Sequence, residues 1–468
     1  MPQQDGPPDD ADDGRHLRDR VTRGTQLGRV ALSHTARTVV GRARQPFQSD
    51  DARAQARDAA ALQLADDLVS ALGSMKGAAM KLGQALSLLN FGLSTAQARD
   101  EFNRRLAPLY RRAPAVDNAV MFGVLDRELG GRRSEIASIE PVPVAAASLG
   151  QVYRGELVDG RTVAIKVQYP SVQSSVRADL KNLALLVRLR GKDFLDVGLE
   201  ELVGEISRQI HLELDYEREY DNHRRVYRAH EGHPVFRIPE PIESLSTPRV
   251  LTTEFLNGRT LDQLGPLDQH TADHLGEAVY RFYCSGVHTT GEFCADPHPG
   301  NIVLLDSGAV GFLDFGLYVT MDPAQVEVEH AVLVAVLTGD VDTAYRHARA
   351  GGFIVDESAM PPEMVMDYLQ TVGGWHLSPG VVQVTPKVAH RSLSAAILPG
   401  SEFRQGIYRQ RVPREHVFSR RTEMSVCALL GELNARGPWR GICEEWVLGA
   451  APATEMGHRI ARWRSTRT

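Results

Sequence analysis

The sequence predicts an α+β fold in which a strand-rich segment lies between two helical regions. Apolar residues recur at helical spacing from about residue 51 to 130, as expected for helices with one core-facing side. Alternating apolar and polar residues, which are typical of half-buried strands, follow Pro143. Beyond Gly258 the pattern is again mostly helical, apart from one short hairpin at 302–315. The chain is therefore predicted to contain a helical region, then a strand-rich segment, and then a second helical region with one short hairpin.

The composition is that of a large globular protein. With 468 residues, of which 43% are hydrophobic, the chain is long enough for two or three domains, or for one two-lobed unit with additions. Its formal net charge of −6 excludes a globally basic nucleic-acid binder, and we expect no nucleic-acid partner. The four cysteines are too far apart for a zinc-binding spacing and are predicted to be buried free thiols. The sequence shows neither a secretory signal nor a membrane span of about 18 apolar residues, which predicts a cytoplasmic protein.

Residues 1–50 are expected to form a disordered tail that contains a basic amphipathic helix. Residues 21–45 hold five arginines and no acidic residue, with Val and Leu between the arginines. Such a segment is typical of helices that bind an anionic membrane surface or a partner, and it predicts peripheral attachment to a membrane. A helix that packs on its own protein is the alternative. Three regions follow the tail: a helical extension at 51–135, a strand-rich lobe with a helical insert at 136–257, and a mostly helical lobe at 258–468.

A hairpin predicted in the strand-rich region presents a lysine. Residues 151–157 and 161–167 alternate across Asp159-Gly160, which is a hairpin turn signature. The second strand contains Val-Ala-Ile-Lys, and an ammonium there can hold nucleotide phosphates, which makes Lys166 a candidate ligand. Upstream lies a stretch of small residues whose backbone can approach phosphates as a glycine-rich loop does, namely Ala145, Ala146, Ala147 and Ser148. Tight packing of a strand is the alternative for that stretch.

Three polar residues downstream follow the order and spacing of a protein-kinase active site. Asp296 and Asn301 are five residues apart, as are the base and the metal-binding asparagine of the kinase catalytic loop. Asp314 begins an Asp-Phe-Gly motif at the end of the hairpin predicted at 302–315. A carboxylate can accept the proton of a hydroxyl nucleophile, and carboxylate and amide oxygens suit a hard cation. Together with Lys166, these residues predict a site for ATP and Mg²⁺.

An acidic stretch at 213–219 contains the glutamate that such a lysine needs. Glu219 is the candidate ion-pair partner of Lys166, and Glu213 and Asp215 form a separate acidic cluster. A solvated helix face is the alternative for acidic residues in a helical stretch.

Seven motifs together resemble those of the UbiB family, the aarF-domain atypical kinases, over about residues 60–320. They are Lys81-Leu82-Gly83-Gln84, Ala145–Val152, VAIKVQYP at 163–170, Glu213–Glu219, LTTEFLNG at 251–258, ADPHPGN at 295–301 and LDFG at 313–316. The resemblance implies a bilobal protein-kinase-like fold with a helical N-terminal extension and a mostly helical C-lobe. It also implies ATP or ADP with Mg²⁺, and a role in isoprenoid lipid or quinone metabolism alongside biosynthetic enzymes as partners.

The resemblance also assigns residues to roles. Lys166 becomes the phosphate-binding lysine, Glu219 its ion-pair partner and Asp296 the base-like aspartate. Asn301 and Asp314 become the metal ligands. The nucleotide contacts fall on the alanine-rich loop and on the segment at 251–258, and the residues are Ala145, Ala146, Ala147, Ser148 and Glu254.

A regulatory element is implied as well. Lys81 and Gln84 share one face of a helix that, in the family, lies over the active site, and Lys81 would pair there with Glu213 and Asp215. We expect this element to block protein-sized substrates and to restrain basal turnover. A lysine that is merely exposed on its helix is the alternative.

Two features depart from conventional protein kinases. Cys294-Ala295 stands where kinases have His-Arg ahead of the catalytic aspartate, and no Ala-Pro-Glu follows Asp314. The sequence therefore predicts an atypical kinase or ATPase. Two alternatives remain open: a small-molecule phosphotransferase of the aminoglycoside or choline kinase type, and a nucleotide-binding scaffold without turnover.

Overall fold

The computed structural model describes two units of the chain. The described residues are 116–147, 149–170, 211–397 and 416–467, with shorter stretches inside 58–107, 204–208 and 403–413. One unit comprises residues 1–115 and 171–210, and the other comprises 116–170 and 211–468. Lys166, Asp296 and Asp314 all belong to the second unit, which therefore holds the candidate site.

The first unit contributes helix α4 (Ala96–Leu106). Phe102 and Leu106 on this helix are buried, and Arg105 pairs with Glu101 one turn earlier at 2.8 Å and with Asp66 at 2.6 Å. The predicted helical character of residues 51–130 is confirmed at α4 and at α5 of the second unit. The predicted basic helix at 21–45 lies outside the described residues.

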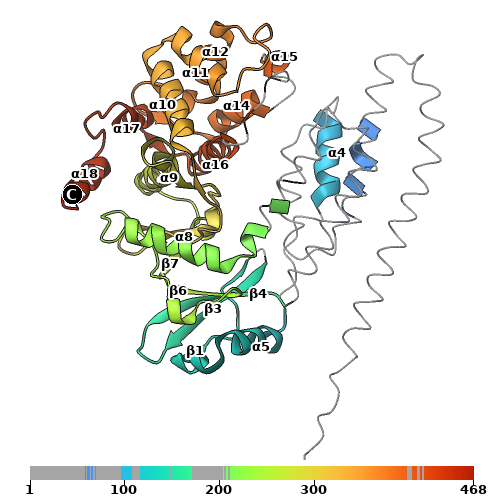
Figure 1. Ribbon diagram of the computed structural model, residues 1–468, viewed down its shortest axis with the longest axis vertical. Helices are drawn as coiled ribbons and strands as arrows, with labels where there is room; N and C mark the ends of the chain where they lie inside the picture. Colours follow the sequence, from blue (N-terminus) through green and yellow to red (C-terminus); the bar gives the residue numbers. More distant parts are fainter. Residues whose placement is uncertain are drawn as a thin grey trace, which may run out of the picture. The chain divides into compact units, whose positions relative to one another are not determined.

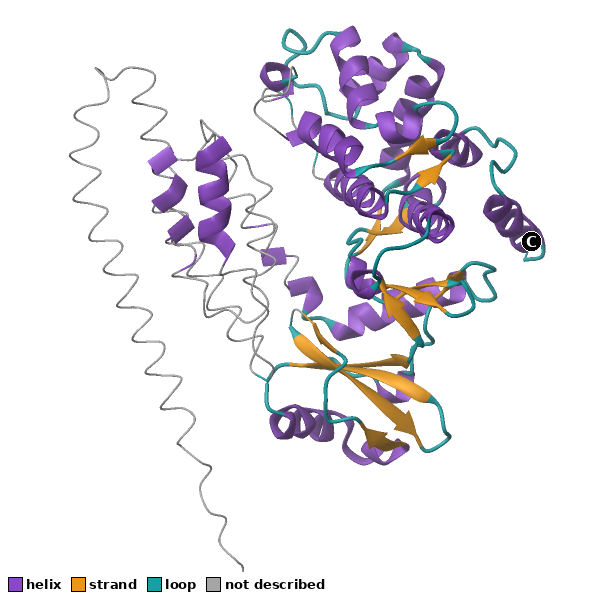
Figure 2. Cartoon of the chain, turned by 180° about the vertical axis from the view of Figure 1, so that it is seen from behind, coloured by secondary structure: helices purple, strands orange, loops and turns teal. Residues whose placement is uncertain are grey.

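An antiparallel sheet forms the first part of the second unit (Figures 1 and 2). Its strands follow the order β1-β3-β4-β6, with β2 paired to β3. The bounds are β1 Ile136–Ile139, β2 Ala145–Ala147, β3 Gly150–Leu157, β4 Thr162–Gln168 and β6 Val250–Glu254. The hairpin predicted across Asp159-Gly160 is confirmed: Asp159 accepts a hydrogen bond from the Arg161 amide at 3.0 Å, and Gly160 has a φ of 86°, which favours glycine.

Helices cover the two faces of this sheet. Helix α5 (Asn118–Leu129) lies on one face and α8 (Tyr216–Ala229) lies on the other (Figure 1). Because side chains alternate along a strand, Ile165 and Lys166 of β4 point to opposite faces. Lys166 is therefore directed towards α8, whereas its neighbour is buried in the core.

Short strands carry the remaining polar motifs. Strands β5 (Phe236–Arg237), β10 (Val310–Phe312), β9 (Ile302–Leu305) and β7 (Gly258–Thr260) are paired in that order, and β8 (Glu292–Cys294) pairs with β11 (Tyr318–Thr320). The predicted hairpin is confirmed, but its second strand ends at Phe312, so Asp314 lies in the following loop. The β8–β11 pair was not predicted, because strands of three residues are too short to show a period.

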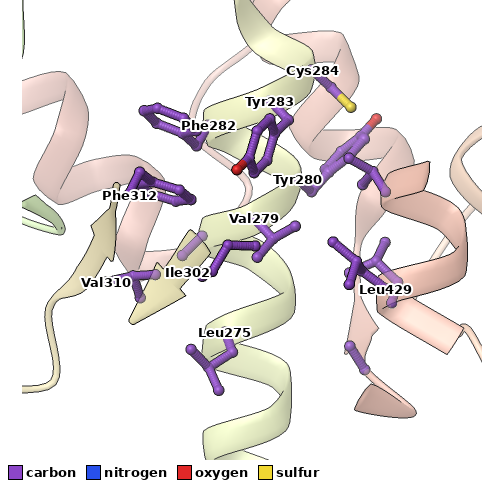
Figure 3. Close-up of a cluster of buried hydrophobic side chains, with 14 of the residues drawn as sticks. Leu275, Val279, Tyr280, Phe282, Tyr283, Cys284, Ile302, Val310, Phe312 and Leu429 are labelled. Carbon is purple, nitrogen blue, oxygen red and sulfur yellow. The ribbon is translucent and has the colours of Figure 1, made fainter. Parts of the chain in front are cut away.

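The rest of the second unit is mainly helical. The helices are α9 Gln269–Thr289, α10 Pro323–Thr338, α11 Val341–Ala350, α12 Pro362–Val372, α13 Gly374–Leu377, α14 Pro386–Ile397, α15 Arg404–Ile407, α16 Val417–Leu433, α17 Trp439–Val447 and α18 Glu455–Ser465, and a short pair joins β12 Val382–Gln383 to β13 Arg436–Gly437. Helix α9 is central to the core, and Phe282 on it stacks on Phe312 of β10 with ring centroids 3.6 Å apart (Figure 3). Burying each such ring contributes roughly 1.5–3 kcal/mol, which fixes the β9–β10 hairpin against α9.

The described helices include none that is both long and apolar enough to cross a membrane. The four cysteines are all described, and each is buried and outside any disulfide, as predicted.

Candidate active site

The structure brings Lys166 and Glu219 together. The Nζ atom of Lys166 lies 2.6 and 2.8 Å from the two carboxylate oxygens of Glu219, and it lies 4.8 Å from the centre of the Tyr216 ring. Glu219 is only 3% exposed and the Lys166 side chain is 20% exposed. The predicted ion pair is thus present, and it joins the sheet to α8.

The environment keeps Lys166 charged. Burial by itself would lower the pKa of this ammonium, but the carboxylates of Glu219 and Asp314 more than offset burial and raise the pKa above its ordinary value. Burial also raises the pKa of the Tyr216 hydroxyl, which stays protonated. Lys166 is therefore a fixed positive charge at any physiological pH.

Helix α8 also holds the Asp-Phe-Gly segment. The Asn222 side chain donates to the carbonyl of Phe315 at 3.1 Å, and the His223 ring packs edge-on against the Phe315 ring with centroids 4.6 Å apart. Burial lowers the pKa of His223 to about 4, so the ring is neutral. Its Nε2 lies 2.7 Å from the Pro239 carbonyl. Because a carbonyl can only accept a hydrogen bond, Nε2 must carry the proton of the ring. Through these side chains, helix α8 therefore fixes the positions of both Lys166 and Phe315, the residue next to Asp314.

Asn301 and Asp314 lie at the same end of the β9–β10 hairpin. The last residue pair of the ladder is Ile302 with Phe312, and beyond it the Leu313 amide donates to the Asn301 carbonyl at 3.0 Å. The Asp314 carboxylate accepts from the Gly316 amide at 2.9 Å. Backbone pairing thus fixes an amide side chain and a carboxylate side chain on neighbouring segments.

These two residues suit a magnesium ion that also binds phosphate. Within the described part of the chain, no three His, Cys, Asp or Glu residues cluster closely enough to hold a metal by themselves. Mg²⁺ commonly takes only one or two protein oxygens and completes its shell with water and phosphate oxygens. The donor set of Asn301 and Asp314 fits that kind of site.

Asp296 follows β8 and pairs with an arginine from a distant helix. The Ala295 amide donates to the Leu317 carbonyl at 2.9 Å, which ties this loop to the segment after Gly316. The Arg421 guanidinium of α16 donates to Oδ1 of Asp296 at 2.8 Å, and both side chains are about one-third exposed, at 35% and 34%. Arg421 therefore orients the carboxylate predicted to act as base.

The remaining predicted nucleotide contacts have mixed positions. Ala145 and Ala146 lie in β2 with exposed side chains, and the backbone of Ala147 pairs with Gly150, whereas Ser148 lies outside the described residues. The Glu254 carboxylate accepts from Arg237 at 2.7 and 2.9 Å, which gives this side chain a structural role. Nucleotide contacts at these positions stay predictions.

The predicted regulatory element is described at its acidic end only. Asp215 is the N-cap of α8, and its side chain accepts from the Arg218 amide at 3.0 Å, an interaction that contributes about 1 kcal/mol to helix stability. Glu213, two residues before Asp215, is half-buried. Lys81 and Gln84 lie outside the described residues, so the proposed gate stays a prediction.

Sequence reasoning missed four residues of this site. Tyr216, Asn222 and His223 share α8 with Glu219, and their spacing of three and four residues from it was the signal that could have found them. Arg421 is 125 residues from Asp296, and no local pattern distinguishes it from the other arginines of the chain.

Comparison with known proteins identifies the family. The model described as the ABC1 atypical kinase-like domain matches residues 108–348. The chain is 32% identical over 293 residues to Atypical kinase COQ8B, mitochondrial, of Danio rerio, which covers 61% of this chain and 45% of that protein. It is 29% identical over 285 residues to AarF domain-containing protein kinase 1 of Gallus gallus, which covers 59% of this chain and 54% of that protein. The chain thus spans about half the length of these relatives.

A solved structure is similar as well. It is titled the complex structure of Rv3197-erythromycin from Mycobacterium tuberculosis, and it matches with a TM-score of 0.60 and 26% identity over 86% of this chain and 98% of that one. The bilobal kinase-like fold is confirmed by this match and by the family model. The family model matches more than half of the chain. The chain therefore belongs to the ABC1 atypical kinase-like family, which is the UbiB or AarF family that its motifs resemble.

Proposed function

We propose that the protein binds ATP or ADP with Mg²⁺ and transfers or hydrolyses the terminal phosphate. The observation that carries the proposal is the buried ion pair of Lys166 and Glu219. The negative charge of Asp314 also stabilises the Lys166 ammonium. A buried pair in which both carboxylate oxygens face one ammonium holds that ammonium in one place. Such a fixed cation is what a phosphate group requires.

The residues of the chain divide the work. Glu219 accepts two hydrogen bonds from the Lys166 ammonium, which has three N–H groups, and one N–H is left to donate to a phosphate oxygen. Asn301 and Asp314 would hold Mg²⁺, which neutralises phosphate charge when it is bound. Asp296, oriented by Arg421, accepts the proton of the attacking hydroxyl or water.

The wider role in this proposal is an atypical kinase or ATPase that supports isoprenoid lipid or quinone metabolism. Membership of the ABC1 family and the seven motifs support it. The basic segment at 21–45 supports reversible attachment to an anionic membrane surface, because each basic residue near such a surface contributes about 1 kcal/mol. Flotation with anionic vesicles at low and high salt tests the attachment, and vesicle binding that is equal at the two salt concentrations contradicts it.

ATP turnover tests the catalytic part of the proposal. We expect the wild-type protein to release phosphate from Mg-ATP, with and without anionic vesicles that contain isoprenoid quinone precursors. Lys166→Ala and Asp296→Asn should each lower turnover at least about tenfold, which corresponds to about 1.4 kcal/mol in the barrier. Lys387→Ala, which removes an exposed lysine of α14, is the matched control and should leave turnover unchanged.

Two other outcomes have defined meanings. Nucleotide binding without turnover in every condition would favour the scaffold alternative. Turnover that appears only with a small-molecule acceptor would favour a small-molecule phosphotransferase. The similar structure whose title names erythromycin supports testing that macrolide as the first such acceptor.

A further inference from the structure

A cavity of about 320 Å³ lies among the helices of the second unit, away from Lys166, Asp296 and Asp314. Side chains from α9, α10, α11, α12, α14 and α16 line it. Most of its wall is apolar, with Val332, Leu333, Met360, Leu369 and Trp375 among the lining residues. Cavities of this size and character are at the lower end of the range that proteins use for small molecules.

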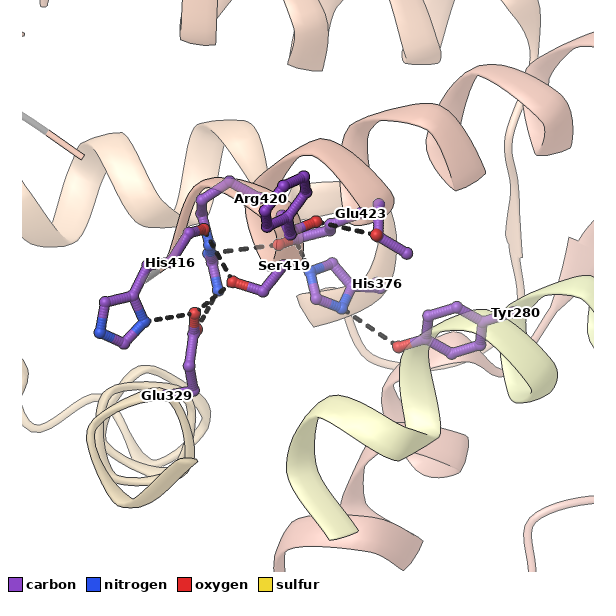
Figure 4. Close-up of polar contacts among 9 residues, drawn as sticks. Tyr280, Glu329, His376, His416, Ser419, Arg420 and Glu423 are labelled. Atoms are coloured by element: carbon purple, nitrogen blue, oxygen red, sulfur yellow. Dashed lines mark hydrogen bonds and ion pairs between the residues drawn. The ribbon is translucent and has the colours of Figure 1, made fainter. Parts of the chain in front are cut away.

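One part of the wall is a buried network of charged and polar side chains (Figure 4). Glu329 accepts from His416 at 2.9 Å, from Ser419 and from Arg420. Arg420 also pairs with Glu423 at 3.2 Å. Ionic groups are expensive to bury, so a network of this kind beside an apolar cavity needs an explanation.

The second carboxylate extends the network towards α9. Glu423 lies 2.9 Å from Nε2 of His376, and Nδ1 of His376 lies 3.1 Å from the Tyr280 hydroxyl (Figure 4). Burial would raise the pKa values of Glu329 and Glu423, but Arg420 and the histidines that contact them lower both to about 2. Both carboxylates are therefore ionised, and one guanidinium lies between them.

The network leaves donors of Arg420 unused. Within the described part of the chain, Nε of Arg420 and Nδ1 of His288 are buried and have no hydrogen-bond partner. Both residues line the cavity, and the positive charge of Arg420 is close enough to His288 to help lower the pKa of the His288 ring. Burial lowers the pKa of His288 to about 4, so its ring is neutral. These two atoms are too enclosed for an occupant of the cavity to reach. The Arg420 side chain as a whole, however, is 34% exposed, and its contacts with Glu329 and Glu423 use one N–H of each terminal nitrogen. Each terminal nitrogen therefore keeps one N–H for an acceptor in the cavity.

The chemistry of these groups restricts the occupant. Arg420 has only donors to offer, so the occupant must supply an acceptor oxygen. Two ionised carboxylates beside one guanidinium disfavour an anion. We propose that this cavity is a binding site for a neutral, mostly apolar small molecule that carries a carbonyl oxygen at the end where Arg420 and His288 lie. The site is separate from the nucleotide site, and the proposal does not depend on the proposed phosphoryl transfer.

Three matched probes test the proposal on the full chain. Butyrophenone is neutral and mostly apolar and carries a carbonyl oxygen, butylbenzene lacks the oxygen, and 4-phenylbutanoate carries a negative charge. Saturation-transfer NMR titrations should show that butyrophenone binds about tenfold more tightly than butylbenzene, as expected for one hydrogen bond to a charged donor. 4-Phenylbutanoate should bind more weakly than either.

Substitutions place the binding in the cavity. Val332→Phe and Ala348→Leu each add volume to its wall and should abolish butyrophenone binding, whereas Val120→Phe on the exposed face of α5 should not. Arg420→Met removes every donor at this position, and it should bring the affinities for butyrophenone and butylbenzene together. Circular dichroism identifies the variants that fold, and either cavity variant is sufficient for the test.

Three results would overturn the proposal. They are no binding of butyrophenone at millimolar concentration, equal affinity for butyrophenone and butylbenzene in the wild type, and unchanged binding in a folded cavity variant. The second result would mean that water alone satisfies the polar end. None of these measurements uses ATP turnover, so failure here is distinct from failure of the proposed enzyme activity.

Discussion

Replacement of Glu219 by glutamine should separate the stability of the site from its affinity for nucleotide. Glu219→Gln keeps the shape of the side chain and removes its charge. The ammonium of Lys166, whose side chain is 20% exposed, then loses its nearest counter-charge. One amide oxygen still accepts a hydrogen bond, and the nearby carboxylate of Asp314 still attracts the ammonium. The variant is therefore expected to fold with reduced stability.

The magnitude follows from the burial of the pair. Removing one partner of a buried ion pair costs roughly 3–5 kcal/mol. The remaining amide oxygen and Asp314 compensate for part of this loss, so Glu219→Gln is expected to cost slightly less than that range, about 2–3 kcal/mol. In a domain of this size such a loss lowers Tm by roughly 5–10 °C. Nucleotide affinity should fall at least about tenfold, because the ammonium is no longer held in one place.

An exposed carboxylate on the same sheet provides the control. Glu140 pairs with Arg154 at 3.2 Å, and the two side chains are 54% and 41% exposed. Exposed pairs contribute about 0–1 kcal/mol, so Glu140→Gln should change Tm by no more than a few degrees. Differential scanning calorimetry measures both variants, first alone and then with a series of Mg-ATP concentrations, since a ligand stabilises the folded state by an amount that depends on its Kd.

Two results would refute this reasoning. If Glu219→Gln loses no more stability than Glu140→Gln, the buried pair does not contribute as its burial indicates. If Glu219→Gln is destabilised but responds to Mg-ATP with the wild-type Kd, Lys166 is not the phosphate ligand. The two outcomes are independent, so the structural role and the binding role are tested separately.

Three further predictions concern the rest of the site. Asp314→Asn removes a carboxylate ligand, so Mg²⁺ should no longer tighten nucleotide binding in a titration, and an undiminished response to Mg²⁺ contradicts the assignment. Arg421→Gln should change the free energy of unfolding by less than about 1 kcal/mol, because the pair with Asp296 is one-third exposed, yet it should lower turnover at least about tenfold; unchanged turnover argues against the positioning role. His223 has a folded pKa of about 4, below its ordinary value, so the unfolded chain binds a proton more readily and stability falls as pH drops from 6.5 towards 4. Between pH 7 and 5 this residue should account for about 2 kcal/mol of lost stability, and urea unfolding of His223→Gln should lack that part of the pH dependence.

Local patterns explain which parts of the fold could be predicted from the sequence. The hairpin at Asp159-Gly160 depends on neighbouring residues, since its alternation and its turn both lie within 19 residues of chain, 150–168. The Lys166–Glu219 pair joins positions 53 residues apart, and it was predicted only because both fall in recognisable motifs. The end of β10 at Phe312 was misplaced, because Leu313 and Phe315 continue an apolar pattern while their backbone has already left the ladder.

Contacts between distant segments lie beyond such patterns. Arg421 meets Asp296 because α16 packs on α9, and α9 leads into β8 just before Asp296. The β8–β11 pair also depends on contacts between distant segments, since each strand has only three residues, too few to show a strand period in the sequence. Tertiary packing therefore determines the Asp296–Arg421 contact and the β8–β11 pair, and no local pattern marks either contact, although Asp296 itself lies in a recognisable motif.

The position of α8 connects the two ends of the site. Its residue Glu219 holds Lys166 from the sheet, while Asn222 and His223 hold Phe315 next to Asp314. Because Phe315 is fully buried, a shift of α8 would expose this ring or break the Asn222 hydrogen bond, and either change costs free energy. The lysine proposed to bind phosphate and the aspartate proposed to bind the metal are thus held in fixed positions by one helix in the absence of nucleotide. A site ordered in advance spends less of the binding energy of its ligand on ordering, which is why mutation of the fully buried His223 should weaken nucleotide binding as well as stability.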